Sequence, residues 1–185
     1  MQSSFVIPHV ETDRLILRAP HLDDLPAMTA FFATERSYMV GGPKDALECW
    51  SSLSNRLGHW ALRGYGLWHL TDKASGTFVG WTGMIYVPGW AEPELGWALM
   101  AEAEGKGLGS EAATAARDYA ARYQDLNGVI SYIAHANDRS RVLARRLGAA
   151  LEHENAELLG KRAQIWRHPK IDVNTPALTA ERTGQ

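Results

Sequence analysis

The chain has 185 residues, of which 45% are hydrophobic and 22% charged, an ordinary composition for one globular domain. Its formal net charge of −2 gives no overall attraction to nucleic acid, so we expect no nucleic-acid partner. The single cysteine, Cys49, excludes an intrachain disulfide, and no apolar run is long enough to span a membrane. The N-terminus lacks the pattern of a signal peptide, so we expect a cytoplasmic protein.

The first third of the chain predicts a loose leader over residues 1–10, then a strand and two helices. Residues 14–18 alternate as a strand does, and the acidic pair Asp23-Asp24 marks the start of the first helix. The second helix is expected over residues 44–62, where apolar side chains recur at helical spacing. Those apolar positions are Leu47, Trp50, Leu53, Leu57 and Trp60. Their aromatic members can shape a pocket, but packing in the core is the favoured interpretation.

The rest of the chain alternates strand patterns with two helical segments. Strands are expected over residues 66–71, 77–87, 94–100, 129–134, 150–154 and 162–168. Asn137 or Asp138 can cap a short helix after the fourth of these strands, and Gly148 can end it. Beyond Pro169 the sequence is polar and without periodicity, which predicts a disordered tail over residues 169–185.

A glycine-rich turn over residues 105–110 joins the strand 94–100 to a helix. Glycines let a ligand approach the backbone closely, and the first N–H groups of a helix attract anions. Three interpretations stay open at this point. The turn can be a tight connection without a ligand, a dinucleotide-binding motif of the form G-x-G-x-x-A over residues 107–112, or a site for the pyrophosphate of coenzyme A. The polar residues 101–104 argue against the dinucleotide motif, which should follow directly on a hydrophobic strand.

Two motifs together resemble the GNAT family of acetyl-CoA-dependent N-acetyltransferases. The family's acyl-CoA loop has the form Q/R-x-x-G-x-G/A, which residues 104–109 occupy. Its later segment has the form N-x-x-S followed by L-G-F, which Asn137, Ser140 and Leu147-Gly148 occupy in part. The N-terminal stretch TDRLILR at residues 12–18 and FVGWTG at residues 78–83 are similar to the RimJ/RimL branch of that family.

The resemblance implies one GNAT domain over residues 11–168, of the α/β (α+β) class. It implies a central mixed, mostly antiparallel sheet of six or seven strands flanked by about four helices. The implied activity moves an acetyl group from acetyl-CoA, as the acyl-donor substrate, to a primary amine. The acceptor is a protein N-terminus or a small-molecule amine, and it attacks directly in a ternary complex. A noncatalytic acyl-CoA-binding module and a nicotinamide dinucleotide enzyme stay as alternatives, no metal or membrane is expected, and a homodimer is an open alternative.

The resemblance also implies which residues bind the coenzyme. They are Leu99, Met100, Glu104, Gly105, Lys106, Gly107, Leu108, Gly109, Ser110, Asn137 and Ser140. Backbone N–H groups near Leu99 and Met100 are expected to stabilise the oxyanion. Glu94 is the expected general base, with a solvent-facing strand end as an equally favoured alternative. Ser140 is the expected proton donor to the thiolate, with a plain first-turn helix residue as the alternative.

Three positions depart from the family pattern. Glu104 stands where Gln or Arg is usual, Ala149 replaces a common Phe, and Ala144 stands where many members carry a tyrosine. The missing tyrosine makes Ser140 the more important proton donor. Four arginines gather on the helix that contains this position, and they fit a solvated face or a role beside phosphates about equally well. They are Arg139, Arg141, Arg145 and Arg146. The seven histidines show no metal-binding spacing, and His135 is the one to examine next as a base.

Overall fold

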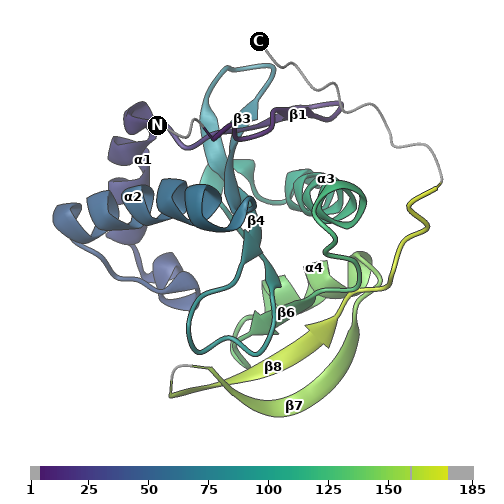
Figure 1. Ribbon diagram of the computed structural model, residues 1–185. Coiled ribbons are helices and arrows are strands. Elements are labelled where there is room, and N and C mark those ends of the chain that lie inside the picture. The colour runs from purple at the N-terminus through teal and green to yellow at the C-terminus, as the bar shows by residue number, and fades with distance from the viewer. Residues whose placement is uncertain (1–4, 159, 175–185) are drawn as a thin grey trace.

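In the computed structural model, residues 5–158 and 160–174 are described, and they form one mixed sheet with helices on both faces (Figure 1). The elements are β1 (Val10–Glu11), β2 (Leu15–Arg18), η1 (Leu22–Asp24), α1 (Leu25–Phe32), η2 (Glu35–Val40), α2 (Ala46–Arg63), β3 (Leu67–Asp72), β4 (Phe78–Ile85), β5 (Glu94–Leu99), η3 (Ala101–Ala103), α3 (Leu108–Tyr123), β6 (Ile130–Ile133), α4 (Asp138–Arg146), β7 (Ala150–Leu158) and β8 (Lys161–Arg167). The strand order is β1-β2-β3-β4-β5-β6-β8-β7, and among these described strands each neighbouring pair except β5–β6 is antiparallel.

This architecture confirms the expected mixed, mostly antiparallel sheet flanked by helices. Within the described residues the sheet has eight strands, and the short β1 makes it wider than the expected six or seven. In β1, Val10 pairs with Leu17 and is buried, so the end of the expected leader belongs to the sheet. Pro8 is also held there, because its carbonyl accepts a hydrogen bond from the Trp68 indole N–H at 2.8 Å.

The first residues of the expected tail also contact the domain. Ile171 accepts a hydrogen bond from the Asn127 side-chain amide and donates one to its carbonyl oxygen, both at 2.9 Å. The Val173 carbonyl accepts from Arg122 at 2.8 Å. The remainder of the expected tail, residues 175–185, lies outside the described residues.

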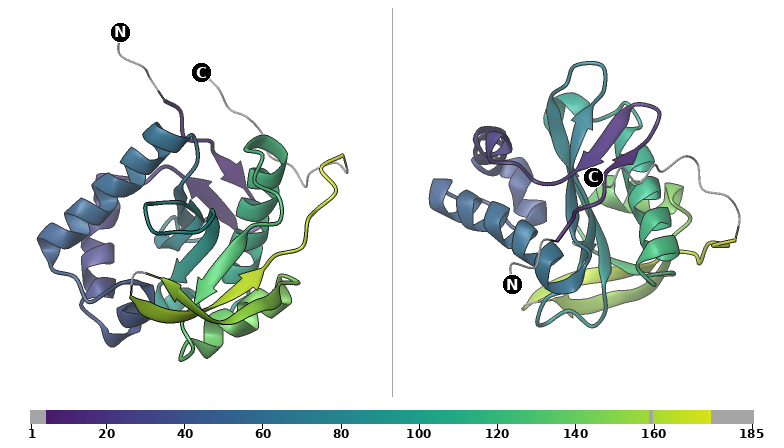
Figure 2. Two further views of the ribbon diagram at one scale, coloured as in Figure 1. Left: turned by 60° about the horizontal axis from the view of Figure 1, so that its bottom comes forward. Right: turned by 45° about the horizontal axis from the view of Figure 1, so that its top comes forward.

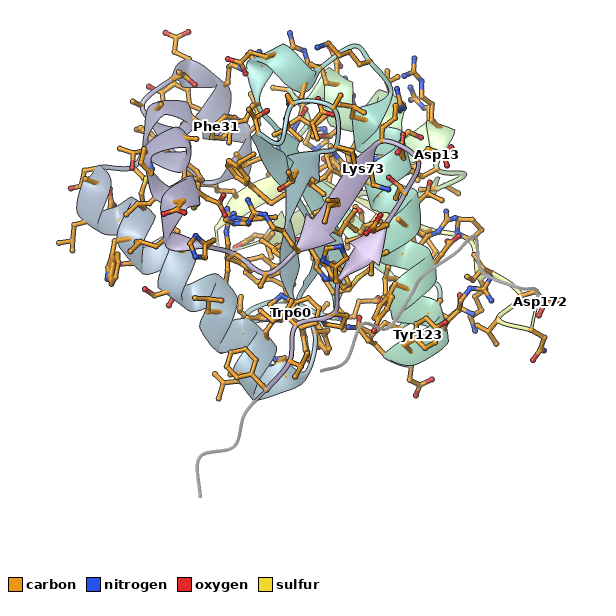
Figure 3. The ribbon with its side chains drawn as sticks, turned by 90° about the horizontal axis from the view of Figure 1, so that it is seen from above. Asp13, Phe31, Trp60, Lys73, Tyr123 and Asp172 are labelled. Carbon is orange, nitrogen blue, oxygen red and sulfur yellow. The ribbon has the colours of Figure 1, made fainter. Side chains whose placement is uncertain are left out.

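α1 and α2 lie on one side of the sheet, and α3 lies on the other (Figure 2). The α1 side buries a cluster in which the ring of Phe31 meets those of Phe32 and Trp81 edge-on, each with ring centroids 5.3 Å apart. Phe31 on α1 and Trp60 on α2 both turn toward the sheet (Figure 3). On the α3 side, alanines at helical spacing let the helix approach β4 and β5 closely. Side chains of one strand therefore alternate between an α1–α2 layer and an α3–α4 layer.

The predicted apolar stripe of α2 is partly wrong. Leu53 and Trp60 are buried as expected, but Leu47 is 72% exposed and Trp50 is 49% exposed. The buried stripe instead includes Cys49 and Arg56. A hydropathy pattern misses this stripe because it ranks an arginine as a surface residue.

Arg56 occupies a core position because its guanidinium finds partners there. Its Nη1 lies 2.7 Å from His69 Nε2, and its guanidinium carbon lies 4.0 Å from the centre of the Trp81 ring. Since arginine can only donate, His69 Nε2 is the acceptor, and the Nδ1–H of His69 therefore donates to Asp24 at 2.6 Å. The network ties β3 to α2 and to the start of α1.

Candidate active site

β5 and β6 part from each other soon after they begin. They run parallel, and their register contains one pair, Glu94 with Ile130. Just beyond it the gap is bridged by a side chain, because the Ser131 hydroxyl donates to the Leu95 carbonyl at 2.6 Å. Farther along β5, the backbone groups that would pair with a neighbouring strand face the gap. A ligand inserted there can make the hydrogen bonds that β6 does not make.

The structure separates the two predicted oxyanion donors. The Met100 N–H donates to the Val79 carbonyl at 2.9 Å and is therefore turned toward β4. Alternate residues of an antiparallel strand direct their backbone groups to opposite sides, so Leu99 directs its N–H toward the gap. Of this pair, Leu99 is the residue positioned to donate to a ligand between β5 and β6.

The glycine-rich loop has the backbone that the sequence predicts. Gly105 and Gly107 have φ angles of +75° and +79°, in the left-handed region that favours glycine. No side chain caps the start of α3, so the first N–H groups of that helix stay open to an anion. A Cβ on Gly109 would lie 3.3 Å from side-chain atoms of Leu99 and Leu143, so a small residue keeps the helix entry close to β5 and α4. Leu108 is buried and contributes packing and backbone rather than a polar side chain.

The turn between β1 and β2 anchors this loop, which the sequence did not indicate. Arg14 donates from Nη1 to the Lys106 carbonyl at 2.8 Å and from Nε to the Glu111 carboxylate at 2.7 Å. Thr12 donates to the same carboxylate at 2.5 Å. Burial raises the pKa of Glu111, but these hydrogen bonds outweigh burial and lower it overall. The carboxylate is therefore charged at neutral pH and holds α3 and its loop against β2.

The α4 side of the gap presents the N-x-x-S motif. The side-chain amide oxygen (Oδ1) of Asn137 accepts from the Ser140 backbone N–H at 3.1 Å, which caps the helix as expected. The Ser140 hydroxyl oxygen accepts from the Trp97 indole N–H at 3.2 Å. Because Trp97 is the donor in that bond, the hydroxyl proton of Ser140 is left to point toward another acceptor.

Glu94 lies where β5 and β6 meet. It is 8% exposed, and its carboxylate accepts from the Tyr132 backbone N–H at 2.8 Å. Burial raises the pKa of Glu94 to about 7, while the Tyr132 N–H and the nearby Trp90 indole act in the opposite direction. A carboxyl group with this pKa exchanges protons readily near neutral pH, as a general base must.

Glu94 and Ser140 lie on opposite faces of the sheet. Leu95 and Trp97 pack with the α3 cluster, whereas Ala98 packs with the α1 cluster. Since strand residues alternate, Glu94 shares the α1 face with Ala98, and Ser140 meets Trp97 on the α3–α4 face. The gap is thus open to a proton acceptor on one face and to a proton donor on the other.

A buried histidine supports the bridge across the gap, and no sequence signal pointed to it. His168 Nε2 lies 2.9 Å from the Ser131 hydroxyl, 37 residues away in the chain. Because that hydroxyl donates to Leu95, the histidine must donate to it. Burial lowers the pKa of His168 to about 4, so the ring is neutral and positions Ser131. His135, which the sequence singled out, instead lies after β6 with its Nδ1 3.7 Å from Glu154.

Three other features of the described residues bear on function. A cavity of about 620 Å³ opens beside Arg18, Asp24 and Phe78, but none of its lining residues belongs to the predicted site. Across residues 5–158 and 160–174, no three His, Cys, Asp or Glu side chains gather as a metal site would require, and no helix is long and apolar enough to cross a membrane. The nicotinamide alternative would need a parallel, doubly wound sheet, which differs from the mostly antiparallel sheet observed here.

Comparison with known proteins identifies the family of the chain. Residues 14–150 match the family described as the acetyltransferase (GNAT) domain. An acetyltransferase from Agrobacterium tumefaciens is 33% identical, and the match covers 92% of this chain and 99% of that one with a TM-score of 0.82. A GnaT-family acetyltransferase from Bordetella pertussis is 25% identical over 88% of this chain and 99% of its own, with a TM-score of 0.74.

The RimJ/RimL likeness is present in the fold. RimL, described as a ribosomal L7/L12 alpha-N-protein acetyltransferase in complex with coenzyme A, is 19% identical over 90% of this chain and 99% of its own. Its TM-score is 0.72, and at this identity the match shows a shared fold. With most of its length inside the family match, and with the loop and the parted strands described above, the chain belongs to the GNAT acetyltransferase family.

Proposed function

We propose that this protein is an N-acetyltransferase that moves an acetyl group from acetyl-CoA to a primary amine by direct attack in a ternary complex. The observation that carries the proposal is the gap between β5 and β6, with the buried carboxyl of Glu94 on one face and Ser140 on the other. The acceptor is a protein N-terminus or a small-molecule amine. The fold shared with RimL, whose structure contains coenzyme A, supports the choice of donor.

The coenzyme would lie between α3 and α4. Its pyrophosphate would accept hydrogen bonds from the open N–H groups at the start of α3, where the helix dipole favours negative charge. The residues proposed to form this part of the site are Glu104, Gly105, Lys106, Gly107, Leu108, Gly109 and Ser110. The acyl arm would extend along β5 past Leu99 and face Asn137 and Ser140 across the gap.

The proposed chemistry assigns each side chain to one proton. Lysine-like amines have a pKa of about 10, so the attacking amine must lose a proton. Glu94 lies five residues before Leu99 on β5 and accepts this proton through water. The amine nitrogen bonds to the acetyl carbonyl carbon, and the Leu99 N–H donates to the oxyanion that forms. The carbon–sulfur bond then breaks, and the Ser140 hydroxyl donates its proton to the departing thiolate. The nitrogen loses its second proton to solvent as the amide forms, solvent returns a proton to Ser140, and Glu94 releases its proton to solvent.

The test is turnover of acetyl-CoA with a panel of acceptors: peptides with free N-termini, polyamines and aminoglycosides. Release of free coenzyme A thiol, together with the mass of the acetylated product, identifies the acceptor class. Direct attack predicts intersecting initial-rate plots when both substrates are varied, whereas parallel plots would indicate an acetylated enzyme intermediate. Tight binding of acetyl-CoA with no turnover of any acceptor would favour the noncatalytic acyl-CoA-binding module.

A further inference from the structure

Glu104, the residue that departs from the family loop, is held by two arginines from distant parts of the chain. Its Oε1 pairs closely with Arg36 Nη2, from η2 and 68 residues away. Its Oε2 accepts from Arg139 Nη1 at 2.7 Å, from the first turn of α4 and 35 residues away. Each carboxylate oxygen therefore has its own guanidinium partner.

These pairs connect the two elements proposed to hold the coenzyme, the glycine-rich loop before α3 and the start of α4. Glu104 directly precedes the glycine-rich loop at the start of α3, and Arg139 lies beside Ser140 at the start of α4. Arg36 approaches from the α1–α2 layer. The ion pair between Glu104 and Arg139 thus joins the loop to the start of α4, between which the phosphates of the coenzyme would lie.

The guanidinium groups of Arg36 and Arg139 can bind a phosphate more strongly than they bind the Glu104 carboxylate. The side chains of Arg36, Glu104 and Arg139 are 32%, 31% and 73% exposed, and ion pairs as exposed as these contribute little to stability. Arg36 Nε is also buried without a hydrogen-bond partner among the described residues. Arginine recognises phosphate and carboxylate oxygens with the same planar set of donors, so a phosphate can replace the carboxylate.

Resting on the proposed function, we propose that Arg36 and Arg139 bind a phosphate of the coenzyme's nucleotide end. In the free protein Glu104 occupies these arginines as an internal stand-in for that phosphate. When the coenzyme binds, its phosphate displaces the carboxylate from at least Arg139. The glutamate at the first position of the loop thereby competes with the coenzyme instead of simply repelling it.

Calorimetric titration with coenzyme A tests this exchange in the full chain. Arg36→Ala and Arg139→Ala should each weaken binding by about tenfold, the usual effect of losing a charge-assisted hydrogen bond. Glu104→Gln should strengthen binding several-fold. Arg146→Ala is the matched control, because it removes the same charge from an exposed position at the far end of α4 and should bind as the wild type does. Thermal unfolding checks that each variant is folded.

A double-mutant cycle separates displacement from simple neutralisation of Glu104. If the phosphate displaces the carboxylate, Arg139→Ala costs more affinity in combination with Glu104→Gln than alone, because Arg139 has no internal competitor in that background. If Arg139 only neutralises Glu104, the cost is larger when Glu104 is present, and the proposal is overturned. Equal affinity of wild type, Arg36→Ala and Arg139→Ala overturns it as well.

Dephospho-coenzyme A, which lacks the 3′-phosphate, locates the contact. The loss caused by Arg139→Ala disappears with this ligand if the arginines bind the 3′-phosphate and persists if they bind the pyrophosphate, and both outcomes are phosphate binding by the pair. A wild-type protein that binds no coenzyme A would contradict the proposed function itself. If the wild type binds and turns over acetyl-CoA and the arginine variants bind coenzyme A with the same affinity, only this inference is contradicted.

Discussion

Two buried carboxyl groups on the same side of the sheet have opposite protonation behaviour. Asp24 and Glu94 are 3% and 8% exposed, so both lose most of their hydration. Burial raises the pKa of Glu94 to about 7. Burial also acts to raise the pKa of Asp24, but hydrogen bonds from Arg18 and His69 outweigh it and hold that pKa well below its usual range. The difference therefore comes from the partners rather than from burial.

The partners differ in charge. Asp24 accepts two hydrogen bonds from the Arg18 guanidinium, at 2.6 and 2.8 Å, and a third from His69. Glu94 accepts from a neutral backbone N–H. An arginine stabilises the charged form of Asp24, whereas one neutral donor does not replace the water that Glu94 has lost. Asp24 is thus fixed as a structural anion, while Glu94 is able to take up and release a proton.

The largest expected effect comes from removing the carboxylate of Glu94. Glu94→Gln should lower turnover by about 10²- to 10⁴-fold at pH 7, the range for loss of a general base. The wild-type rate should rise as pH increases through about 7, where Glu94 loses its proton, and the variant should lack that rise. The variant should recover partly at high pH, where more of the amine is already neutral. A pH–rate profile measures both effects.

Asp125→Asn is the control for that experiment, because it removes an equal charge from an exposed position after α3. It should retain the wild-type profile. A normal profile for Glu94→Gln would mean that the proton is accepted elsewhere and that the contrast with Asp24 has no catalytic meaning.

The next effect concerns the proton donor across the sheet. Ser140→Ala should lower turnover on the order of 10²-fold at every pH, because it removes the proposed donor to the thiolate. Coenzyme A affinity, measured by calorimetry, should stay close to wild type, since the backbone contacts of the helix remain. Normal turnover would show that another group or a water protonates the sulfur.

Asp24→Asn should lower stability rather than turnover, because Asp24 is a structural anion. It leaves Arg18 and Arg56 without their buried counter-charge, which should lower the free energy of unfolding by about 3 kcal/mol. A depressed pKa gives stability above the ordinary value of 3.8 that is lost as pH falls, so the deficit should shrink in acid. Urea unfolding at pH 7 and pH 3 measures this. Turnover per folded molecule should stay near wild type, and a loss comparable to that of Glu94→Gln would erase the contrast.

The smallest effect is a gain in stability from Glu94→Gln. A raised pKa means that the wild type has its full stability below the ordinary value of 4.5 and loses stability as pH rises through about 7. Glutamine can still accept from the Tyr132 N–H but carries no charge. At pH 8 the variant should therefore be more stable by about 2 kcal/mol, and at pH 5 the difference should be small. Thermal unfolding at the two pH values measures it, and equal stability at pH 8 would mean that Glu94 is better solvated than its burial indicates.

The sequence predicted those features that depend on residues close together in the chain, such as turns, helix faces and helix caps. The roles of Gly105, Gly107 and the alanines of α3 could be predicted because turn geometry and helix spacing are local properties. The cap formed by Asn137 and Ser140 could be predicted for the same reason, because the two partners of a helix cap lie within a few residues of each other in the sequence.

Side-chain clusters assembled from distant segments could not be predicted in this way. Asp24 meets His69 45 positions farther along the chain, and Arg36 meets Glu104 across 68 positions. Nothing near Arg56 in the sequence indicates that it is buried beneath Trp81. The pKa of Glu94 belongs to the same class, because it depends on β6 and the β4–β5 loop closing around the carboxyl group.

The far edge of the sheet has a consequence for the behaviour of the protein in concentrated solution. β7 is an edge strand of nine residues, and such an edge can recruit strands from other molecules. Its side chains are nearly all exposed, three of them are glutamates, and its register with β8 shifts twice. Charge and irregular pairing both oppose edge-to-edge growth. Replacing Glu154 and Glu157 by neutral side chains would remove part of that protection, so this edge is where self-association of such a variant would begin.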